Sequence, residues 1–179
     1  HRDLAELVGM FVGTVVLRTR IDPNSTFAEL LSHVRTVDLD AFEHADVPFD
    51  RLVDAIRPRR SAAHHPLFQV GFSYQNLAPT RLTLDGVDAE IVEPSLGVAK
   101  SDLHLTLVDQ GGVDHSGDAI AQTSSTPMRV QWDYDRDLFD HSTVERWHRL
   151  WVEILTTALD GLETPVGDLA ADITGGMLT

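Results

Sequence analysis

The sequence predicts an α/β fold in which a mixed sheet is packed against helices. Three observations support this class. Apolar and polar residues alternate along the middle of the chain, apolar residues recur at helical intervals near both ends, and 42% hydrophobic with 23% charged content suits a folded core. With 179 residues, the chain has the size of one globular domain, which we expect to span residues 1–162.

The first predicted element is a buried strand over residues 10–20. This stretch is rich in Val and Leu, and Gly13 is its one residue that disfavours regular structure. Asp22 and Pro23 follow, and this pair favours a turn. If this strand ran parallel to a strand over residues 67–76, the crossover between them would be right-handed.

Two amphipathic helices are predicted next. Thr26 and Glu29 have the spacing of a capping box, so the first helix begins after Thr26. Its apolar stripe comprises Phe27, Leu30, Leu31, Val34, Val37 and Ala41. Pro48 suits a first helical position and Pro58 ends the second helix. The second stripe comprises Phe49, Leu52, Val53 and Ile56.

Period-two alternation then predicts several strands. Residues 67–76 place Phe72 and Tyr74 on an aromatic side and small or polar residues on the other. Residues 103–107 and 128–134 alternate in the same way. Residues 82–92 are expected to form a hairpin that turns at Asp85-Gly86.

The last third of the sequence predicts a loop, a helix and a tail. Residues 109–127 are dominated by Gly, Ser, Thr and Asp, which predicts a long mobile loop. Asp140 is a good helix cap, and Gly161 is a natural stop for a helix that ends at Asp160. Its apolar face comprises Val144, Trp147, Leu150, Trp151, Ile154, Leu155 and Ala158. Residues 163–179 have the composition of a linker.

Composition excludes several classes of function. A formal charge of −14 repels phosphate backbones and anionic membranes, so neither nucleic acid nor a membrane is an expected partner. There are no cysteines, which excludes thiolate metal sites. The nine histidines lack metal-ligand spacing, so we expect no metal site. No run of about eighteen apolar residues and no signal peptide is present, so we expect a cytoplasmic protein.

Five stretches, taken in order, resemble successive signatures of one enzyme family, the condensation domains of nonribosomal peptide synthetases. They are Val8-Gly9-Met10-Phe11-Val12-Gly13-Thr14, His44-Ala45-Asp46-Val47-Pro48-Phe49-Asp50, the loop from Arg60 to Leu67, Lys100-Ser101-Asp102-Leu103 and Asp137-Leu138-Phe139-Asp140. Gly13 stands where the family usually has asparagine. The similarity covers residues 7–151.

The resemblance implies the C-terminal lobe of a condensation domain, one lobe of a chloramphenicol acetyltransferase-like fold. Such domains join a carrier-bound acyl or peptidyl thioester to a carrier-bound aminoacyl acceptor. The family's His-His-x-x-x-Asp-Gly motif belongs to the other lobe. His64-His65 is followed by Pro66 and Leu67 and does not match that motif. We therefore assign no catalytic residue to this chain and expect negligible activity from it alone.

The resemblance also implies partners: the N-terminal lobe and upstream and downstream carrier domains. No cofactor is expected to bind here, because phosphopantetheine is carried by the carrier domains. A lone lobe should leave an apolar face uncovered, which favours self-association.

Candidate site residues follow from the strand pattern. Ser73, Gln75 and Asn76 are either solvent-facing strand positions or the lining of a substrate channel, where small polar side chains would admit a pantetheine arm. Lys100 and Asp102, two residues apart in an expected strand, would share a face and form an exposed ion pair, or would shape a segment between lobes.

The cluster Arg57, Arg59 and Arg60, together with His64 and His65, is the one positive patch of an acidic chain. A helix C-terminus stabilises nearby cations, which explains Arg57 structurally. Docking of an acidic carrier domain is the alternative.

Two other functions stay open: a non-catalytic docking module, and a related epimerisation domain or acyltransferase. An upstream coding sequence for His-His-x-x-x-Asp-Gly would favour the enzyme.

Overall fold

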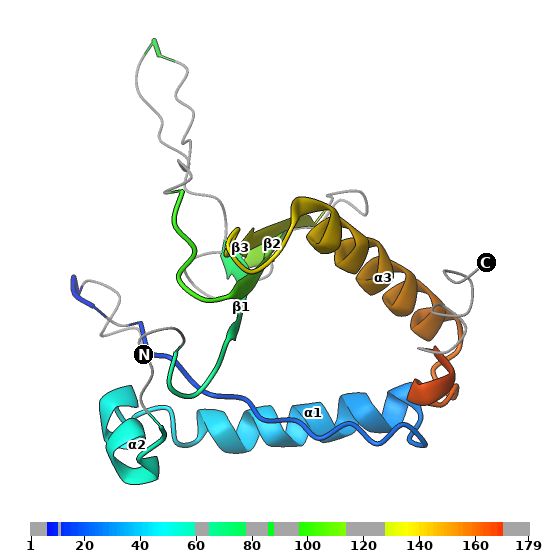
Figure 1. Ribbon diagram of the computed structural model, residues 1–179, viewed down its shortest axis with the longest axis horizontal. Coiled ribbons are helices and arrows are strands. Elements are labelled where there is room, and N and C mark those ends of the chain that lie inside the picture. Colours follow the sequence, from blue (N-terminus) through cyan, green and yellow to red (C-terminus); the bar gives the residue numbers. More distant parts are fainter. Residues whose placement is uncertain are drawn as a thin grey trace. The chain divides into compact units, whose positions relative to one another are not determined.

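The computed structural model describes residues 7–10, 12–59, 65–77, 86–87, 97–113 and 128–169 (Figure 1). The chain divides into two compact units. One comprises residues 1–60 with 146–179, and the other comprises residues 61–145.

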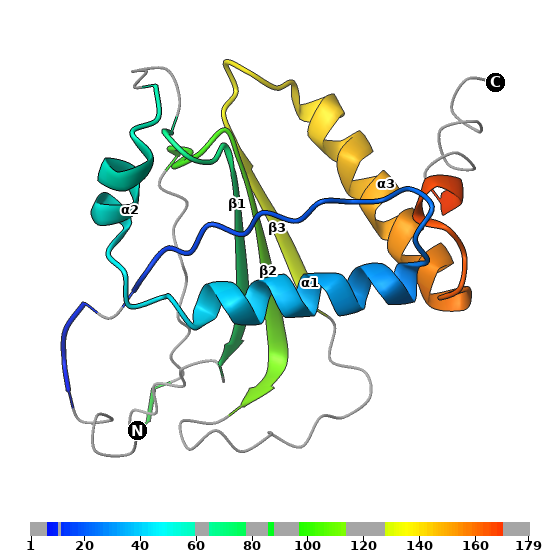
Figure 2. The same cartoon turned by 90° about the horizontal axis from the view of Figure 1, so that it is seen from below.

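The unit of residues 61–145 is built on a three-stranded mixed sheet. Its strands are β1 (Val70–Leu77), β2 (Leu103–Val113) and β3 (Arg129–Tyr134), in the order β1-β2-β3. Strand β2 is parallel to β1 and antiparallel to β3 (Figure 2). The mixed sheet and these three strand predictions are therefore confirmed.

The register aligns the side chains of the sheet into rows of like character. Leu105 on the central strand lies opposite Phe72 and Trp132, and it is 8% exposed. The next row is polar and joins Ser73, Thr106 and Gln131. Successive side chains on a strand point to opposite faces, so the sheet has one apolar face and one polar face.

Strand β2 is longer than the alternating pattern predicts. It continues through Gly111 and Gly112 to Val113, which pairs with Leu77 of β1. The mobile loop predicted over residues 109–127 is therefore wrong for residues 109–113. The pairing of Val113 with Leu77 follows a shift in register after Val108, so the strand continues although the composition of these residues favours a loop. Residues 114–127 lie outside the described residues, as does the predicted hairpin apart from Gly86 and Val87.

The other unit contains helices α1 (Phe27–Phe42) and α2 (Phe49–Ile56), and both predicted helices are confirmed. The capping box is formed: the Glu29 amide donates to Thr26 Oγ1 at 3.1 Å, and the Thr26 amide donates to Glu29 Oε2 at 2.9 Å. Helix α2 ends at Arg57, whose φ of 49° is left-handed.

Helix α3 spans His141–Asp160, and it follows Asp140 as predicted. Its buried residues Val144 and Ala158 belong to the predicted apolar face. Among the described residues, no helix combines the length and the hydropathy that a bilayer span requires.

The segment that follows α3 packs against the start of α1. Pro165 forms a β-bridge with Thr26, and the Val166 amide donates to the Ser25 carbonyl at 2.9 Å. Leu169 is only 2% exposed. The prediction of a linker is therefore wrong for residues 163–169. Gly, Pro and Thr are common in linkers, but they also suit tight turns whose backbone groups are hydrogen-bonded. Residues 170–179 lie outside the described residues.

The predicted first strand is also wrong for its described part. Residues 12–22 contain no strand pairing among the described residues. Val12 is 85% exposed, and Leu17 and Ile21 are also exposed. The turn predicted after it is confirmed, since the Ser25 amide donates to the Asp22 carbonyl at 3.1 Å. An apolar pattern favours extended backbone, whereas pairing requires a neighbouring strand.

Candidate substrate groove

A groove of about 920 Å³ follows the polar face of the sheet. All of its lining residues belong to the unit of residues 61–145. They come from the three strands, from the segment before β2 and from the turn after β3: Ser73, Gly97, Val98, Ala99, Lys100, His104, Thr106, Gln131, Trp132, Asp133, Tyr134, Asp135, Arg136 and Asp137. Polar side chains therefore meet at one concave surface.

A hydrogen bond between His104 and Ser73 joins β2 to β1 within this groove. The distance between His104 Nε2 and Ser73 Oγ is 2.9 Å, and both residues are half-buried. Ser73 lies directly opposite Thr106 in the parallel pair, so His104 reaches diagonally along β1. The bond therefore depends on the parallel register of the two strands.

Gly71 makes room for the imidazole ring. It lies directly opposite His104, and a Cβ atom at this position would lie 2.9 Å from His104 Cε1 and closer still to Nδ1. Any larger residue would force the ring to move. Gly71 thus leaves the space that the His104 ring occupies.

The β3 side of the groove supplies further hydrogen-bonding groups. The side-chain amide of Gln131 donates from Nε2 to Asp133 Oδ2 at 3.0 Å, and Asp133 lies opposite His104. In the turn after β3, the Asp137 amide donates to Asp135 Oδ1 at 2.8 Å. These carboxylates therefore have protein partners of their own.

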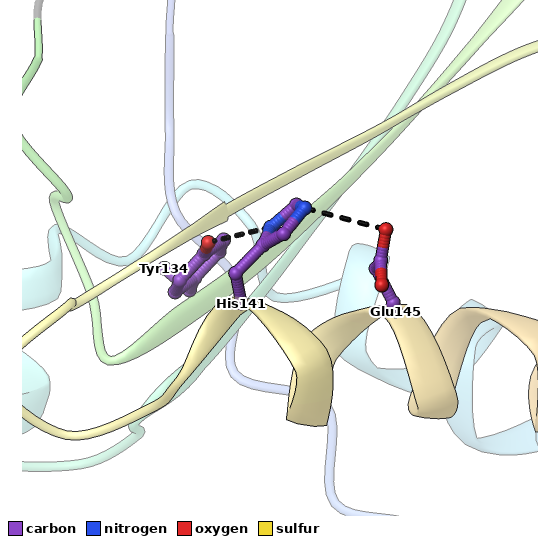
Figure 3. A network of polar contacts seen from close by, with 3 residues as sticks. All are labelled: Tyr134, His141 and Glu145. Atoms are coloured by element: carbon purple, nitrogen blue, oxygen red, sulfur yellow. Dashed lines mark hydrogen bonds and ion pairs between the residues drawn. The ribbon is translucent and has the colours of Figure 1, made fainter.

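A second polar network connects the end of β3 to the start of α3 (Figure 3). The Tyr134 hydroxyl lies 3.0 Å from His141 Nδ1, and His141 Nε2 lies 3.3 Å from Glu145 Oε1. The side chains of His141 and Glu145 are 76% and 52% exposed. Exposed pairs of this kind stabilise a helix start weakly, so we assign this network a structural role.

On the apolar face, the Tyr74 hydroxyl donates to Asp109 Oδ2 at 3.0 Å. This hydrogen bond raises the pKa of Tyr74 above its ordinary value. Within the described part of the chain, no three His, Asp or Glu side chains are grouped closely enough to bind a metal ion.

A comparison with models of protein families identifies the family of this chain. The family model described as "Condensation domain" matches residues 1–172. The chain belongs to the condensation domain family. A dimodular nonribosomal peptide synthase of Bacillus subtilis (strain 168) is 35% identical over 166 residues, covering 93% of this chain and 7% of that protein. The chain thus spans a small part of this relative.

Solved structures support the condensation-type fold. A four-domain nonribosomal peptide synthetase bound to AMP and glycine aligns with a TM-score of 0.69 at 22% identity, over 93% of this chain and 13% of that one. The complex of the X-domain and OxyB from teicoplanin biosynthesis aligns with a TM-score of 0.67 at 23% identity, over 86% of this chain and 31% of that one. At these identities the likeness concerns the fold.

In this member of the condensation domain family, the predicted channel residues do not all line the groove. Ser73 lies in the groove, whereas Gln75 and Asn76 are exposed and do not line it. Sequence analysis missed His104 as a site residue. The sequence did contain a signal for His104, because the alternation over residues 103–107 places His104 and Thr106 together on the polar side of that strand.

The expected ion pair between Lys100 and Asp102 is absent from the described residues, and this prediction is wrong. Both residues lie in a bend before β2, so the two-residue alternation of a strand does not align them. Lys100 lines the groove, and the Asp102 carbonyl accepts a hydrogen bond from the Asp135 amide at 3.0 Å.

The predicted basic patch is partly described. Arg57 and Arg59 are exposed at and beyond the end of α2. Arg60 and His64 lie outside the described residues.

Proposed function

We propose that this chain is the C-terminal lobe of a condensation domain and that it forms one wall of the site where an amide bond is made. The match of the family model to residues 1–172 carries the proposal. The groove on the polar face of the sheet supports it, because it offers a concave, hydrogen-bonding surface within one compact unit.

The proposed reaction is aminolysis of a thioester. The acceptor amine attacks the thioester carbonyl, the C–N bond forms, the C–S bond breaks, and the amine proton ends on the departing thiol. A positioned histidine contributes about 10²- to 10⁴-fold to such proton transfer. Because the sequence has no His-His-x-x-x-Asp-Gly motif, the complementary lobe supplies that group.

The role of this chain would be to orient the substrates. Ser73 and His104, which both line the groove, would face the substrate channel. Lys100 at the rim would contact the segment between lobes. Holding reactants in a near-attack geometry lowers the barrier independently of any proton transfer.

The proposed partners are the N-terminal lobe and upstream and downstream carrier domains in the cytoplasm. The carrier domains would bring phosphopantetheine, and the chain itself would bind no cofactor. Carrier domains that are acidic would be attracted to Arg57 and Arg59, which are exposed.

Reconstitution tests the proposal. The chain is mixed or fused with an N-terminal condensation lobe that contains His-His-x-x-x-Asp-Gly, and two loaded carrier proteins are added. We expect amide product by mass spectrometry from the pair of lobes and negligible product from the chain alone. A matched lobe with the second motif histidine replaced by alanine serves as control. Robust product from the chain alone contradicts the proposal.

A docking module is the second candidate, and one comparison favours it. The X-domain of teicoplanin biosynthesis, which shares this fold, was solved in complex with another protein, OxyB. If the reconstituted lobes make no amide while the chain still binds a carrier or another protein of its pathway, the docking function replaces the catalytic one.

A further inference from the structure

The hydrogen bond between His104 and Ser73 leaves the pair with spare binding capacity. If Nε2 carries the proton and donates to Ser73, the serine hydroxyl is left to donate to a ligand and Nδ1 can accept. If the serine donates instead, Nδ1 carries the proton and the serine oxygen can accept. In either tautomer the pair offers one donor and one acceptor.

The pair is held in place before any ligand binds. The His104 ring lies against Gly71 of β1, where a Cβ would overlap it, and its Nε2 is hydrogen-bonded to Ser73 Oγ. His104 also lies on β2, the central strand, between two hydrogen-bonded neighbours. Side chains that are fixed in advance lose little entropy when they bind, so their hydrogen bonds contribute to selectivity.

The groups in the same row are neutral. Thr106 and Gln131, which neighbour Ser73 across the sheet, carry a hydroxyl and an amide, and both line the groove. Charged residues also line the groove, and Asp133 lies opposite His104, but its carboxylate accepts a hydrogen bond from the Gln131 side chain. The row that contains Ser73 therefore matches an uncharged group that both donates and accepts, namely an amide or a hydroxyl.

We propose that the His104–Ser73 pair determines substrate specificity by binding a neutral amide or hydroxyl side chain of the aminoacyl or acyl group. This inference rests on the proposed function, which defines the ligand as an aminoacyl or acyl group. The groove volume of about 920 Å³ lies near the upper end of small-molecule sites, which is more space than a slender unbranched arm fills.

Binding to the 179-residue chain tests this inference without requiring catalysis. The probes are glutaminyl and methionyl aminopantetheine, in which an amide replaces the thioester. The two side chains are similar in length, but only glutamine carries the amide. Affinity is measured by calorimetry, and the His104 ring resonances are followed by NMR.

We expect the glutaminyl probe to bind about tenfold more tightly than the methionyl probe, as one or two net hydrogen bonds imply. Ser73→Ala and His104→Ala should each bring the affinity ratio close to one. Gln75→Ala is the matched control, because Gln75 lies on the same strand outside the groove, and its ratio should equal that of the unchanged chain.

Gly71→Ala provides a test that keeps both members of the pair. The added methyl group displaces the His104 ring, so selectivity should fall as it does in Ser73→Ala. Circular dichroism reports whether the variant folds, and Ser73→Ala, which removes one oxygen atom, keeps the test valid if Gly71→Ala does not.

Three results overturn the inference: equal affinity of the two probes, a glutamine preference that survives both Ser73→Ala and His104→Ala, or identical shifts of the His104 resonances with pantetheine alone. The proposed function fails separately, when reconstituted lobes form no amide. Selective binding without amide formation would leave the specificity site intact and remove the catalytic role.

Discussion

Residues 12–22 and strand β1 have similar apolar patterns but different structural roles. Strand β1 is paired with β2 over most of its length, whereas residues 12–22 pair with no strand among the described residues. Yet Phe72 on β1 is itself 60% exposed. Pairing of the backbone and burial of the side chains are therefore separate events, and an apolar pattern predicts neither one by itself.

Exposed apolar side chains occur in both regions. Val12 and Phe72 are among the large apolar residues that lie at the surface. Single exposed apolar side chains are normal, whereas a large contiguous patch of them marks a surface that another protein packs against. Self-association of the isolated chain, which the sequence predicts, stays a prediction.

The largest expected effect distinguishes the buried sheet from the unpaired segment. Leu105→Ala, at the centre of the sheet, should lower the free energy of unfolding by about 2–4 kcal/mol, because it removes a buried side chain and leaves a cavity. Val12→Ala, in the exposed segment, should change it by less than about 0.5 kcal/mol. Urea denaturation measures both. Equal losses would show that residues 12–22 are packed in solution.

A smaller loss of stability is expected at the start of α1, the first helix after residues 12–22. Thr26→Ala removes the side-chain cap of α1 and should cost about 1 kcal/mol of stability. Ser32→Ala, at an exposed position within the same helix, is the control and should be neutral or slightly stabilising. Urea denaturation that shows the same midpoint for both variants would contradict the role of the cap.

The smallest effect concerns Tyr74 on β1, and it is measured as a titration. The chain has two tyrosines, so Tyr134→Phe leaves Tyr74 as the single one. Its ultraviolet absorbance should titrate above the ordinary pKa of about 10, because the hydrogen bond to Asp109 favours the protonated hydroxyl. Asp109→Asn should bring the pKa of Tyr74 closer to its ordinary value.

The pH dependence of stability follows from the sign of this shift. The pKa of Tyr74 is raised in the folded chain, so the stabilisation is fully present below the unfolded pKa and is lost as the pH rises through the folded one. Alkaline unfolding should therefore depend less on pH in Tyr74→Phe. A midpoint of Tyr74 titration at or below its ordinary pKa would exclude the hydrogen bond in solution.

Local signals predicted the helices correctly. The capping box at Thr26, the proline before α2 and the glycine after α3 act within one or two turns of chain, so the sequence contains the whole cause. The errors occur where distant partners act. Strand β2 continues through residues 109–113 to Val113, which pairs with Leu77 of β1, and residues 163–169 pack on the start of α1.

The candidate site was predicted in part for the same reason. Alternation along β1 identified Ser73 as a polar strand position, and alternation along the next strand placed His104 beside Thr106. Their hydrogen bond depends on the parallel register of β1 and β2, in which Gly71 lies opposite His104. The spacing of residues within a single strand does not specify the register between two strands.

The sequence by itself determined the family, the helices, the strand-forming segments and the acidic charge, because these depend on residue identity and on neighbours close in the chain. The tertiary structure decided which strands pair, that Gly71 admits the His104 ring, and that Ser73 rather than Gln75 lies in the groove. The physical reason is that hydrogen bonding and packing between strands depend on register, which is set only when residues distant in sequence meet.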